Sequence, residues 1–558
     1  MNKKVELYFN TIRYLKSSQI FYRLYRKIVP TWKVHGCDTI KIPVHVMIRE
    51  MDLDESYLKR FDCESLLNNE IFLLNEKHRV DFKDWTITGE TTHLWIFNLH
   101  YMEYLIPMAA RYSSTKEEVY YSKIKEILES WINRFEKADN NAWNPYTISL
   151  RFVNWLIVME LLGERLSVDY TFKIGLEQSL YRQYKYLKSN QEKHLLGNHY
   201  FENLKTLIIA GILFDDQKNL GRYLKCFNRQ IQEQILEDGM HYERSFMYHN
   251  IIMEGVLRVL VVLKQAKGHD TYQEVCNITL GRMLNCMLSF EGRVRRIPLF
   301  NDAGNNVAKP VSALGRGVRK YLPAQVTVDN TIKVLSGAGY YRYELGNVMC
   351  IIDCGEIGPN YIPGHGQCDC LSYELYIDGV PFIVNSGTYQ YQSSKRMYFR
   401  STRAHNCFTI NGEEQSQCWG EHRVAKRISD VRAVYGTEGF TGRCELWNGV
   451  RACRKMKFVK ECVIVEDVCE NMSDAVIQSY MHLAPDVEII KLGERKYQLV
   501  HSKNKYKMYL EILSGKEVIV HSDDEICWYA EEFGRLEKKK VLELSGNTII
   551  YKIYWGIK

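Results

Sequence analysis

The stretch YELYIDGVPFIVNSG, residues 373–387, decides the fold class of the C-terminal part of the chain. In it, two apolar runs flank the pair Asp378-Gly379. Such a pair between apolar runs is typical of a two-residue β-hairpin, because both turn positions require a positive φ. A second stretch, CFTINGEEQ at residues 407–415, repeats the arrangement with Asn411-Gly412. Both stretches therefore predict antiparallel strands joined by tight turns.

On either side of these turns, the chain divides into two parts that differ in the spacing at which apolar residues recur. From about Val334 onward the period is two, which predicts an all-β, sandwich-like part. From about Leu94 to about Tyr321 the period is helical, and stretches such as SLRFVNWLIVMELLGERL (149–166) are apolar all round. Such helices pack between others, which fits an α/α bundle or toroid. We expect an N-terminal connecting segment, a helical domain and a β-domain, at residues 1–93, 94–325 and 335–558.

Composition limits the classes of partner. The chain has 558 residues, with 74 basic against 67 acidic side chains and a net charge of +7. This excess is too small for a nucleic-acid-binding surface, but it is compatible with an acidic substrate. The aromatic content of 12% is a weak indication of carbohydrate binding. Oligomeric state is left open by the sequence.

The N-terminus and the cysteines indicate a compartment. Charged residues interrupt the first thirty positions, so we expect an amphipathic helix there and no cleaved signal peptide. No window of about 18 apolar residues predicts a membrane span. The 16 cysteines contain no CxxC pair, and we interpret most of them as buried thiols in a reducing compartment. The expected location is the cytoplasm, with export by another route left open.

The first polar cluster lies in LLGNHYFENLKTLIIAGILF, residues 195–214. At about 100° per residue, Asn198, His199 and Glu202 share one quadrant of a helix whose other side is apolar. An amide, an imidazole and a carboxylate would then face one place. The alternative is a helix start with an ordinary solvated face.

A second cluster lies in LEDGMHYERSFMYHNIIMEGV, residues 236–256. Ser245 is a candidate N-cap, which would put Tyr248 in the first turn of an apolar helix, with Glu243 and Arg244 just before it. The alternative is a loop ion pair followed by a core tyrosine.

Two further clusters occur where strands begin. In PGHGQCDCLSYEL (363–375), His365 precedes a strand-like alternation, which suits a catalytic site, a metal site or a polar turn. In YFRSTRAHNCFTING (398–412), one short segment contains Arg400, Arg403 and His405, and such a group is typical of an anion-binding site. An ordinary solvated loop is the alternative for this last segment.

Taken in chain order, these segments resemble the heparinase II/III family of polysaccharide lyases, and alginate lyases of similar architecture. The resemblance implies an N-terminal α/α toroid, an incomplete barrel, followed by a C-terminal antiparallel β-sandwich, in agreement with the two apolar periods. The matching pieces are collinear: LWIFNLHYMEYL (94–105), GNHYFENLKTLIIAG (197–211), DGMHYERSFMYH (238–249), PLFNDAG (298–304), PGHGQCDCLSYEL (363–375), FIVNSGTYQY (382–391) and RSTRAHNCFTING (400–412).

The resemblance also implies β-elimination at a uronic acid, which leaves a 4,5-unsaturated sugar. Because the C5 proton is weakly acidic beside a charged carboxylate, such an enzyme needs a donor that neutralises the carboxylate, a base and an acid. By resemblance, Asn198 is the neutraliser with His199 beside it, Tyr248 protonates the leaving C4 oxygen, and His365 is the base or assists it. The residues expected to orient or contact the acidic polysaccharide are Glu202, Glu243, Arg244, Arg400 and Arg403.

The chain departs from the family pattern at a metal site that many members carry in the β-domain. The corresponding positions are Gln367, Asn385 and His405. Two amides and one imidazole are poor zinc ligands, and calcium would still require a carboxylate such as Asp369. We therefore expect that no cofactor is required. Zinc or calcium at these three positions stays open, as does a hydrogen-bonded arrangement without an ion.

Two other function classes are weighed against the lyase. A glycoside hydrolase would use paired carboxylates, for instance Glu202 with Glu243 or Asp302, and would leave a saturated reducing end. A non-catalytic glycan-binding or polysaccharide-assembly protein would be indifferent to Tyr248→Phe. The hydrolase does not explain why Asn198, Tyr248 and His365 occur together.

Overall fold

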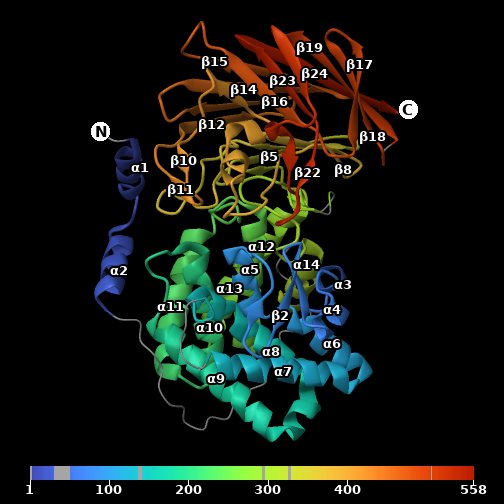
Figure 1. The fold of residues 1–558 in the computed structure, drawn as a ribbon. Coiled ribbons are helices and arrows are strands. Elements are labelled where there is room, and N and C mark those ends of the chain that lie inside the picture. Colours follow the sequence, from blue (N-terminus) through green and yellow to red (C-terminus); the bar gives the residue numbers. More distant parts are fainter. Residues whose placement is uncertain are drawn as a thin grey trace.

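The computed structural model describes residues 3–29, 51–135, 141–291, 294, 296–323, 328–503 and 505–557. Figure 1 shows a helical part, coloured blue to green, beside a β-rich part, coloured yellow to red. Helices α1 (Lys3–Ile12) and α2 (Ser17–Ile28) lie along one flank of the molecule, α1 next to the β-rich part and α2 next to the helical part.

The helical part is an incomplete α/α toroid, as the sequence predicted. Helices α6, α8, α10, α12 and α14 pack against one another in that order, while α7, α9, α11 and α13 contact them as a second layer. The helices are α5 (His93–Tyr101), α6 (Leu105–Thr115), α7 (Glu118–Arg134), α8 (Pro145–Val168), α9 (Tyr170–Ser189), α10 (Gly197–Leu213), α11 (Gln217–Gln234), α12 (Phe246–Gln265), α13 (Asp270–Phe290) and α14 (Val311–Tyr321).

Residues 51–92 cover the toroid on one side. They form helices α3 (Glu55–Leu58) and α4 (Cys63–Leu67) and a three-stranded sheet of β1 (Glu70–Leu73), β2 (Glu76–Asp81) and β3 (Thr86–Ile87). The indole of Trp85 donates a hydrogen bond to Ser130 at 3.0 Å, and that of Trp95 donates to the carbonyl of Glu76 at 3.2 Å. Within the connecting segment expected over residues 1–93, residues 30–50 lie outside the described residues.

Two helices are long and apolar enough to cross a membrane by length and composition, α8 and α12. In each, most of the apolar window is buried inside the fold, 72% in α8 and 89% in α12. Both belong to the inner layer of the toroid, so packing against neighbouring helices accounts for their apolar character.

The β-rich part consists of stacked antiparallel sheets, as predicted. The five-stranded sheet contains β4 (Val334–Leu335), β5 (Tyr340–Leu345), β6 (Val348–Asp353), β7 (Tyr373–Ile377) and β8 (Val380–Ile383). The four-stranded sheet has the order β20 (Glu517–His521), β23 (Val541–Gly546), β16 (Ile477–His482) and β9 (Phe408–Ile410). The eight-stranded sheet has the order β12 (Ser429–Tyr435), β13 (Gly439–Glu445), β14 (Arg451–Val459), β15 (Cys462–Cys469), β24 (Thr548–Ile557), β19 (Tyr506–Ser514), β18 (Lys496–His501) and β17 (Val487–Gly493). Two short hairpins, β10 (Cys418–Trp419) with β11 (Arg423–Val424) and β21 (Trp528–Tyr529) with β22 (Glu537–Lys538), complete this part.

Of the two turns used to predict the fold class, the first joins two paired strands as predicted, whereas the second does not. Asp378 and Gly379 join β7 to β8 with φ values of 53° and 76°. Asn411 and Gly412 also have positive φ, 52° and 74°, but their turn closes only a single bridge between Ile410 and Glu413. Strand β9 instead pairs with β16, which arrives much later in the chain.

The 15 cysteines among the described residues are free thiols, and most of them are buried. Burial raises the pKa of a thiol such as that of Cys276, to about 12. Thiols of this kind pack as small apolar side chains and are poor nucleophiles.

Two glycines with similar backbone angles provide a test of packing in the β-part. A Cβ on Gly387 (φ +77°) would lie 1.9 Å from the carbonyl oxygen of Ala530, whereas a Cβ on Gly412 (φ +74°) would meet open space. Gly412→Ala should lower the free energy of unfolding by about 1–2 kcal/mol through its positive φ alone. Gly387→Ala should lower it by about 2–4 kcal/mol, because overpacking adds to the backbone strain. Chemical denaturation measures both, and equal losses would contradict the steric argument.

Candidate active site

A cavity of about 490 Å³ opens where the toroid meets the β-part. Helices α5, α8, α10 and α12 contribute to its walls, together with loops of the β-part. The polar and aromatic residues in its lining include Tyr146, Asn198, His199, Glu202, Tyr248, His365, Tyr391 and His422. The four residues expected to be catalytic thus line the same cavity, although they come from three distant segments.

The first turn of α10 brings two of these residues to the cavity. Leu196 and Gly197 both have positive φ, 67° and 58°, so the chain turns sharply into the helix. A Cβ on Gly197 would lie 3.0 Å from Glu243, so this position favours glycine. Asn198 is 3% exposed, and no other described side chain forms a hydrogen bond with its amide. This amide is therefore free to bind a ligand in the cavity.

His199 is paired with a buried carboxylate. Its Nδ1 lies 3.1 Å from Oε1 of Glu192, and Asn203 donates a hydrogen bond to Oε2 of the same carboxylate. The imidazole packs against the ring of Tyr146, with centroids 4.5 Å apart. Burial lowers the pKa of His199, but the charge and hydrogen bond of Glu192 outweigh burial and raise the pKa above its ordinary value. This arrangement favours the imidazolium form.

Tyr248 lies in the first turn of α12, as predicted. Ser245 caps the helix, since its hydroxyl accepts a hydrogen bond from the backbone N–H of Tyr248 at 3.3 Å. The Tyr248 hydroxyl lies 2.9 Å from that of Tyr391, and its ring stacks on His365 with centroids 3.9 Å apart. Burial, followed by the influence of Tyr391, raises the pKa of Tyr248 well above its ordinary value. The phenol therefore keeps its proton.

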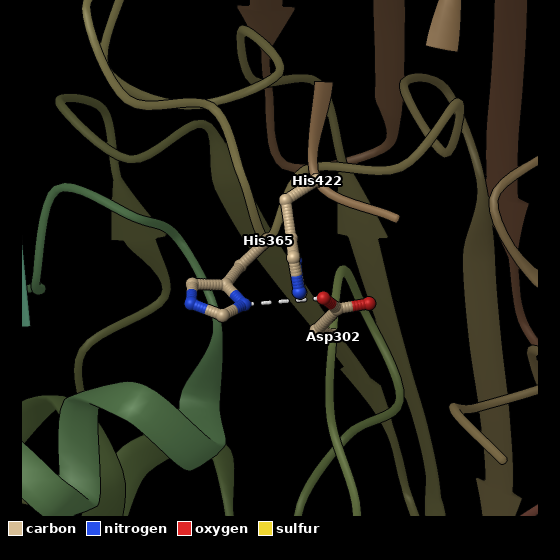
Figure 2. Close-up of side chains that lie close together, drawn as sticks. All are labelled: Asp302, His365 and His422. Carbon is tan, nitrogen blue, oxygen red and sulfur yellow. Dashed lines mark hydrogen bonds and ion pairs between the residues drawn. The ribbon is translucent and has the colours of Figure 1, made fainter. Parts of the chain in front are cut away.

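His365 enters the cavity from the β-part and is held by Asp302. The distance from Nδ1 to Oδ2 of Asp302 is 3.1 Å, and Figure 2 shows this ring edge facing Asp302 while the other nitrogen faces away. Arg396 donates two hydrogen bonds to Asp302, at 2.6 and 2.7 Å. Burial raises the pKa of Asp302, but Arg396 and His365 together hold it far below its usual range. Because a carboxylate only accepts, Nδ1 carries the proton and Nε2 keeps its lone pair.

Two expected contact residues, Glu243 and Arg244, lie outside the lining of the cavity. Glu243 is 1% exposed, and its Oε2 is 3.8 Å from Nε2 of His365. Burial raises the pKa of Glu243. The side chain of Arg244 donates to the carbonyl of Glu356 at 2.9 Å. Glu243 can thus act electrostatically on His365 from outside the cavity lining. Arg244 instead binds the backbone of the β-part.

Glu202 does line the cavity, but it forms a buried ion pair with Lys205. This pairing bears on the hydrolase alternative, which needs a carboxyl group free to donate or accept a proton. Asp302 is paired with Arg396, and Glu243 is outside the lining. The three carboxylates proposed for a hydrolase are therefore poorly placed for that chemistry.

The two expected anion-binding arginines do not reach the cavity lining. Arg400 is completely buried, and its guanidinium donates to the backbone carbonyls of Gly366 and Arg423 at 3.1–3.2 Å. Arg403 is exposed on a short 3-10 turn, Thr402–Ala404. The arginines in the lining are Arg60 and Arg258, whereas Arg396, in α15 (Arg396–Phe399), acts on the site through its pairing with Asp302.

The positions expected for a metal all take part in hydrogen bonds. Gln367 Oε1 lies 2.7 Å from Nε2 of His405, and Gln367 also donates to Asp302 at 2.8 Å. Asn385 Oδ1 accepts from the backbone N–H of Asn406 at 3.0 Å. This donor set does not fit zinc or calcium, because it offers two amides and an imidazole that already have partners.

A different group, Asp302, His365 and His422, has ligand atoms within 4.8 Å of one another and could hold a cation by distance. However, Arg396 already places a positive charge on both oxygens of Asp302. A cation at this point would have to displace or repel that guanidinium. We therefore derive no chemistry from a metal here.

Sequence reasoning missed several residues of the site. Tyr391 lies within the quoted segment FIVNSGTYQY, and Glu192 precedes His199 by seven residues, but neither carries a local signal. His422 lies in the turn between β10 and β11, and Arg396 just precedes a quoted segment. The partners of Tyr391 and Arg396 are 143 and 94 residues away in the chain, so a residue pattern could not find these two.

The pairing of His199 leads to a testable expectation. Glu192→Gln should lower the pKa of His199, because the anion that raises it is lost while burial remains. Histidine-ring NMR titration measures this change, with Glu129→Gln, at a half-buried position on α7, as the matched control. In the unaltered protein the pair stabilises the fold below the ordinary pKa of histidine, and this contribution is lost as pH rises through the raised pKa. If the pKa of His199 were unchanged in Glu192→Gln, carboxylates other than Glu192 would be responsible for raising it.

Comparison with solved structures supports the fold. The crystal structure of a heparinase III gives a TM-score of 0.71 at 17% identity, over 96% of this chain and 89% of the other. A heparan sulfate lyase from Pedobacter heparinus gives 0.58 at 16% identity, over 97% and 88%.

Two relatives match in sequence, both named heparin-sulfate lyase. That from Pedobacter heparinus is 22% identical over 351 residues, which is 57% of this chain and 52% of the relative. That from Bacteroides thetaiotaomicron is 21% identical over 398 residues, 61% of this chain and 55% of the relative. The chain thus spans about half the length of the curated relatives it matches.

Two family models cover most of the chain. The heparinase II/III N-terminus matches residues 47–328, which is half of the chain, and the heparinase II/III-like C-terminal domain matches residues 327–553. The α/α toroid, the stacked antiparallel sheets and the cavity between them agree with both matches. The chain belongs to the heparinase II/III family.

Proposed function

We propose that the protein is a polysaccharide lyase that cleaves a uronic-acid-containing acidic polysaccharide by β-elimination. The observation that carries the proposal is the stacking of Tyr248 on His365, 3.9 Å apart, in the cavity that Asn198 and His199 also line. A proton donor, a base and two groups suited to a carboxylate thus face one space. The names of the two matched relatives support the same reaction class.

Binding of the uronate carboxylate is the first requirement. Asn198 offers an amide without a side-chain partner, and His199 carries a raised pKa through Glu192. Both features favour a negative charge in the cavity. As the C5 proton leaves, charge grows on the carboxylate, so fixed donors at this position stabilise the transition state more than the ground state.

Proton transfer is the second requirement. Nε2 of His365 has its lone pair because Asp302 accepts from Nδ1, so this nitrogen takes the C5 proton. The electrons of that C–H bond form the C4–C5 double bond while the C4–oxygen bond breaks. The leaving oxygen receives the phenolic proton of Tyr248, whose raised pKa keeps it protonated until that moment. Asp302 stabilises the imidazolium that forms, as a carboxylate does beside a catalytic histidine.

The substrate class follows from the same groups. They recognise and eliminate at a uronate, and they require no sulfate contact. The relatives' name makes heparan-type polysaccharide the first substrate to examine, together with chondroitin, hyaluronan, alginate and bacterial capsules. A non-catalytic glycan-binding protein would have no need of a buried phenol stacked on an imidazole in the cavity.

The proposal is tested by the absorbance of the new double bond in the ultraviolet. His365→Ala and Tyr248→Phe should each lower kcat/KM by about 10²–10⁴-fold, because each removes one proton-transfer group. Asn198→Ala should lower it by about 10²–10³-fold through loss of one donor to the developing charge. Arg403→Ala is the matched control, since Arg403 is exposed and outside the cavity lining, and it should retain activity.

Two outcomes would overturn the proposal. One is the absence of an unsaturated product from the whole uronate panel with a folded, unaltered protein. The other is a product whose new non-reducing end is saturated, which would identify a hydrolase. Mass spectrometry separates these products, because hydrolysis adds water and elimination does not.

The pairing of Asp302 leads to a separate expectation about metals. Treatment with a strong chelator should leave both the lyase rate and the melting temperature unchanged, because Arg396 rather than a cation balances Asp302. Loss of activity on chelation, restored by zinc or calcium alone, would contradict this assignment of charge.

A further inference from the structure

Helices α1 and α2 have an unusual polarity. Of the 25 large apolar side chains that are exposed in the described residues, ten belong to residues 5–29. They are Val5, Tyr8, Phe9, Ile12, Ile20, Phe21, Leu24, Tyr25, Ile28 and Val29. Contiguous apolar surface of this kind marks an interaction site in a folded protein.

On α2 the inner face is polar and the outer face is apolar. Gln19, 1% exposed, donates to the carbonyls of Leu195 and Tyr361, and Arg26 donates to that of Asn190 at 2.8 Å. At 100° per residue, the stripe of Ile20, Phe21, Leu24, Tyr25 and Ile28 is centred almost opposite Gln19. The end of the stripe is the most open, with Ile28 79% exposed. A surface helix normally shows the reverse arrangement.

Helix α1 repeats this arrangement. Thr11 accepts a hydrogen bond from the indole of Trp419 at 3.0 Å, and Asn10 is 5% exposed on the inner side. Val5, Phe9 and Ile12 recur at helical spacing on the opposite side and are 50–64% exposed. The outer faces of both helices therefore lie on one flank of the molecule (Figure 1).

Charge decides which kind of partner this flank fits. Residues 3–29 contain seven basic side chains, Lys3, Lys4, Arg13, Lys16, Arg23, Arg26 and Lys27, against the single acid Glu6. Lys426 lies 3.2 Å from Glu6, so even this acid has a cation beside it. Lys193 and Arg423 add further cations beside Tyr22 and Tyr8. An apolar, aromatic-rich stripe bordered by Lys and Arg is the pattern of helices that lie in the surface of an anionic bilayer.

We propose that α1 and α2 form a docking surface for an anionic lipid bilayer, with the stripe defined by the ten exposed residues seated at the level of the lipid headgroups. This surface is separate from the cavity, and none of the ten residues lines it. The proposal therefore does not depend on the lyase activity.

Vesicle flotation of the full chain tests the proposal. The protein should float with vesicles of one part phosphatidylglycerol to two parts phosphatidylcholine, and poorly with phosphatidylcholine alone, with binding weakened by salt. The triple variant Phe9→Ser, Phe21→Ser and Leu24→Ser should lose about tenfold or more in apparent affinity, because it removes apolar area from the stripe. Since the three side chains are exposed, the melting temperature should not fall.

The matched control replaces three exposed apolar side chains elsewhere. Ile490→Ser, Leu492→Ser and Ile519→Ser, on β17 and β20, should bind vesicles as the unaltered protein does. Three outcomes would overturn the proposal: no flotation with anionic vesicles at low salt, equal loss in the control variant, or a dimer in sedimentation velocity that the stripe variant dissociates. The last result would identify a second copy of the chain as the occupant.

Discussion

One carboxylate, that of Asp302, ties the two halves of the site together. Its side chain binds His365 and Arg396, and its backbone N–H donates to the carbonyl of His365 at 2.9 Å. Its own carbonyl accepts from Ser245 at 2.6 Å, and Ser245 caps the helix that carries Tyr248. One residue therefore positions the imidazole of the β-part and the phenol of the toroid. Removing one member of a buried ion pair lowers the free energy of unfolding by about 3–5 kcal/mol. The fold therefore depends on both Asp302 and Arg396.

Buried charges beside the cavity are also paired with one another. Arg258 contacts Asp52 at 2.6 Å and Glu254 through Nε at 2.9 Å, while Lys309 lies 2.9 Å from Glu254 and 3.2 Å from Asp52. Two cations and two anions are thus balanced among segments that are distant in sequence. Buried networks of this kind specify an arrangement more than they add stability. Because these cations are already paired, an incoming carboxylate is met chiefly by the first turn of α10.

The sequence predicts those features that depend on neighbouring residues. The Asp378-Gly379 turn and the Ser245 cap are settled within four residues, and the structure confirms both. The toroid and the sheets follow from apolar periods sustained over many turns and strands. Arg396 and Arg400 show where such reasoning stops. They are four residues apart, yet only Arg396 meets Asp302, which lies 94 residues earlier in the chain. Selection between two nearby arginines depends on tertiary packing, and no local pattern contains that information.

The N-terminal helices also bear on the cavity through the β10–β11 hairpin. Trp419 of β10 donates to Thr11 of α1, and its ring packs on Tyr8 with centroids 4.7 Å apart. The turn that follows Trp419 carries His422 into the cavity lining. The contact between α1 and the β10–β11 hairpin therefore joins the outer flank to a wall of the site. A partner that binds α1 only while α1 is packed on the hairpin must stabilise this packed state. By linkage, a ligand that orders the hairpin must raise the affinity for that partner by the same factor.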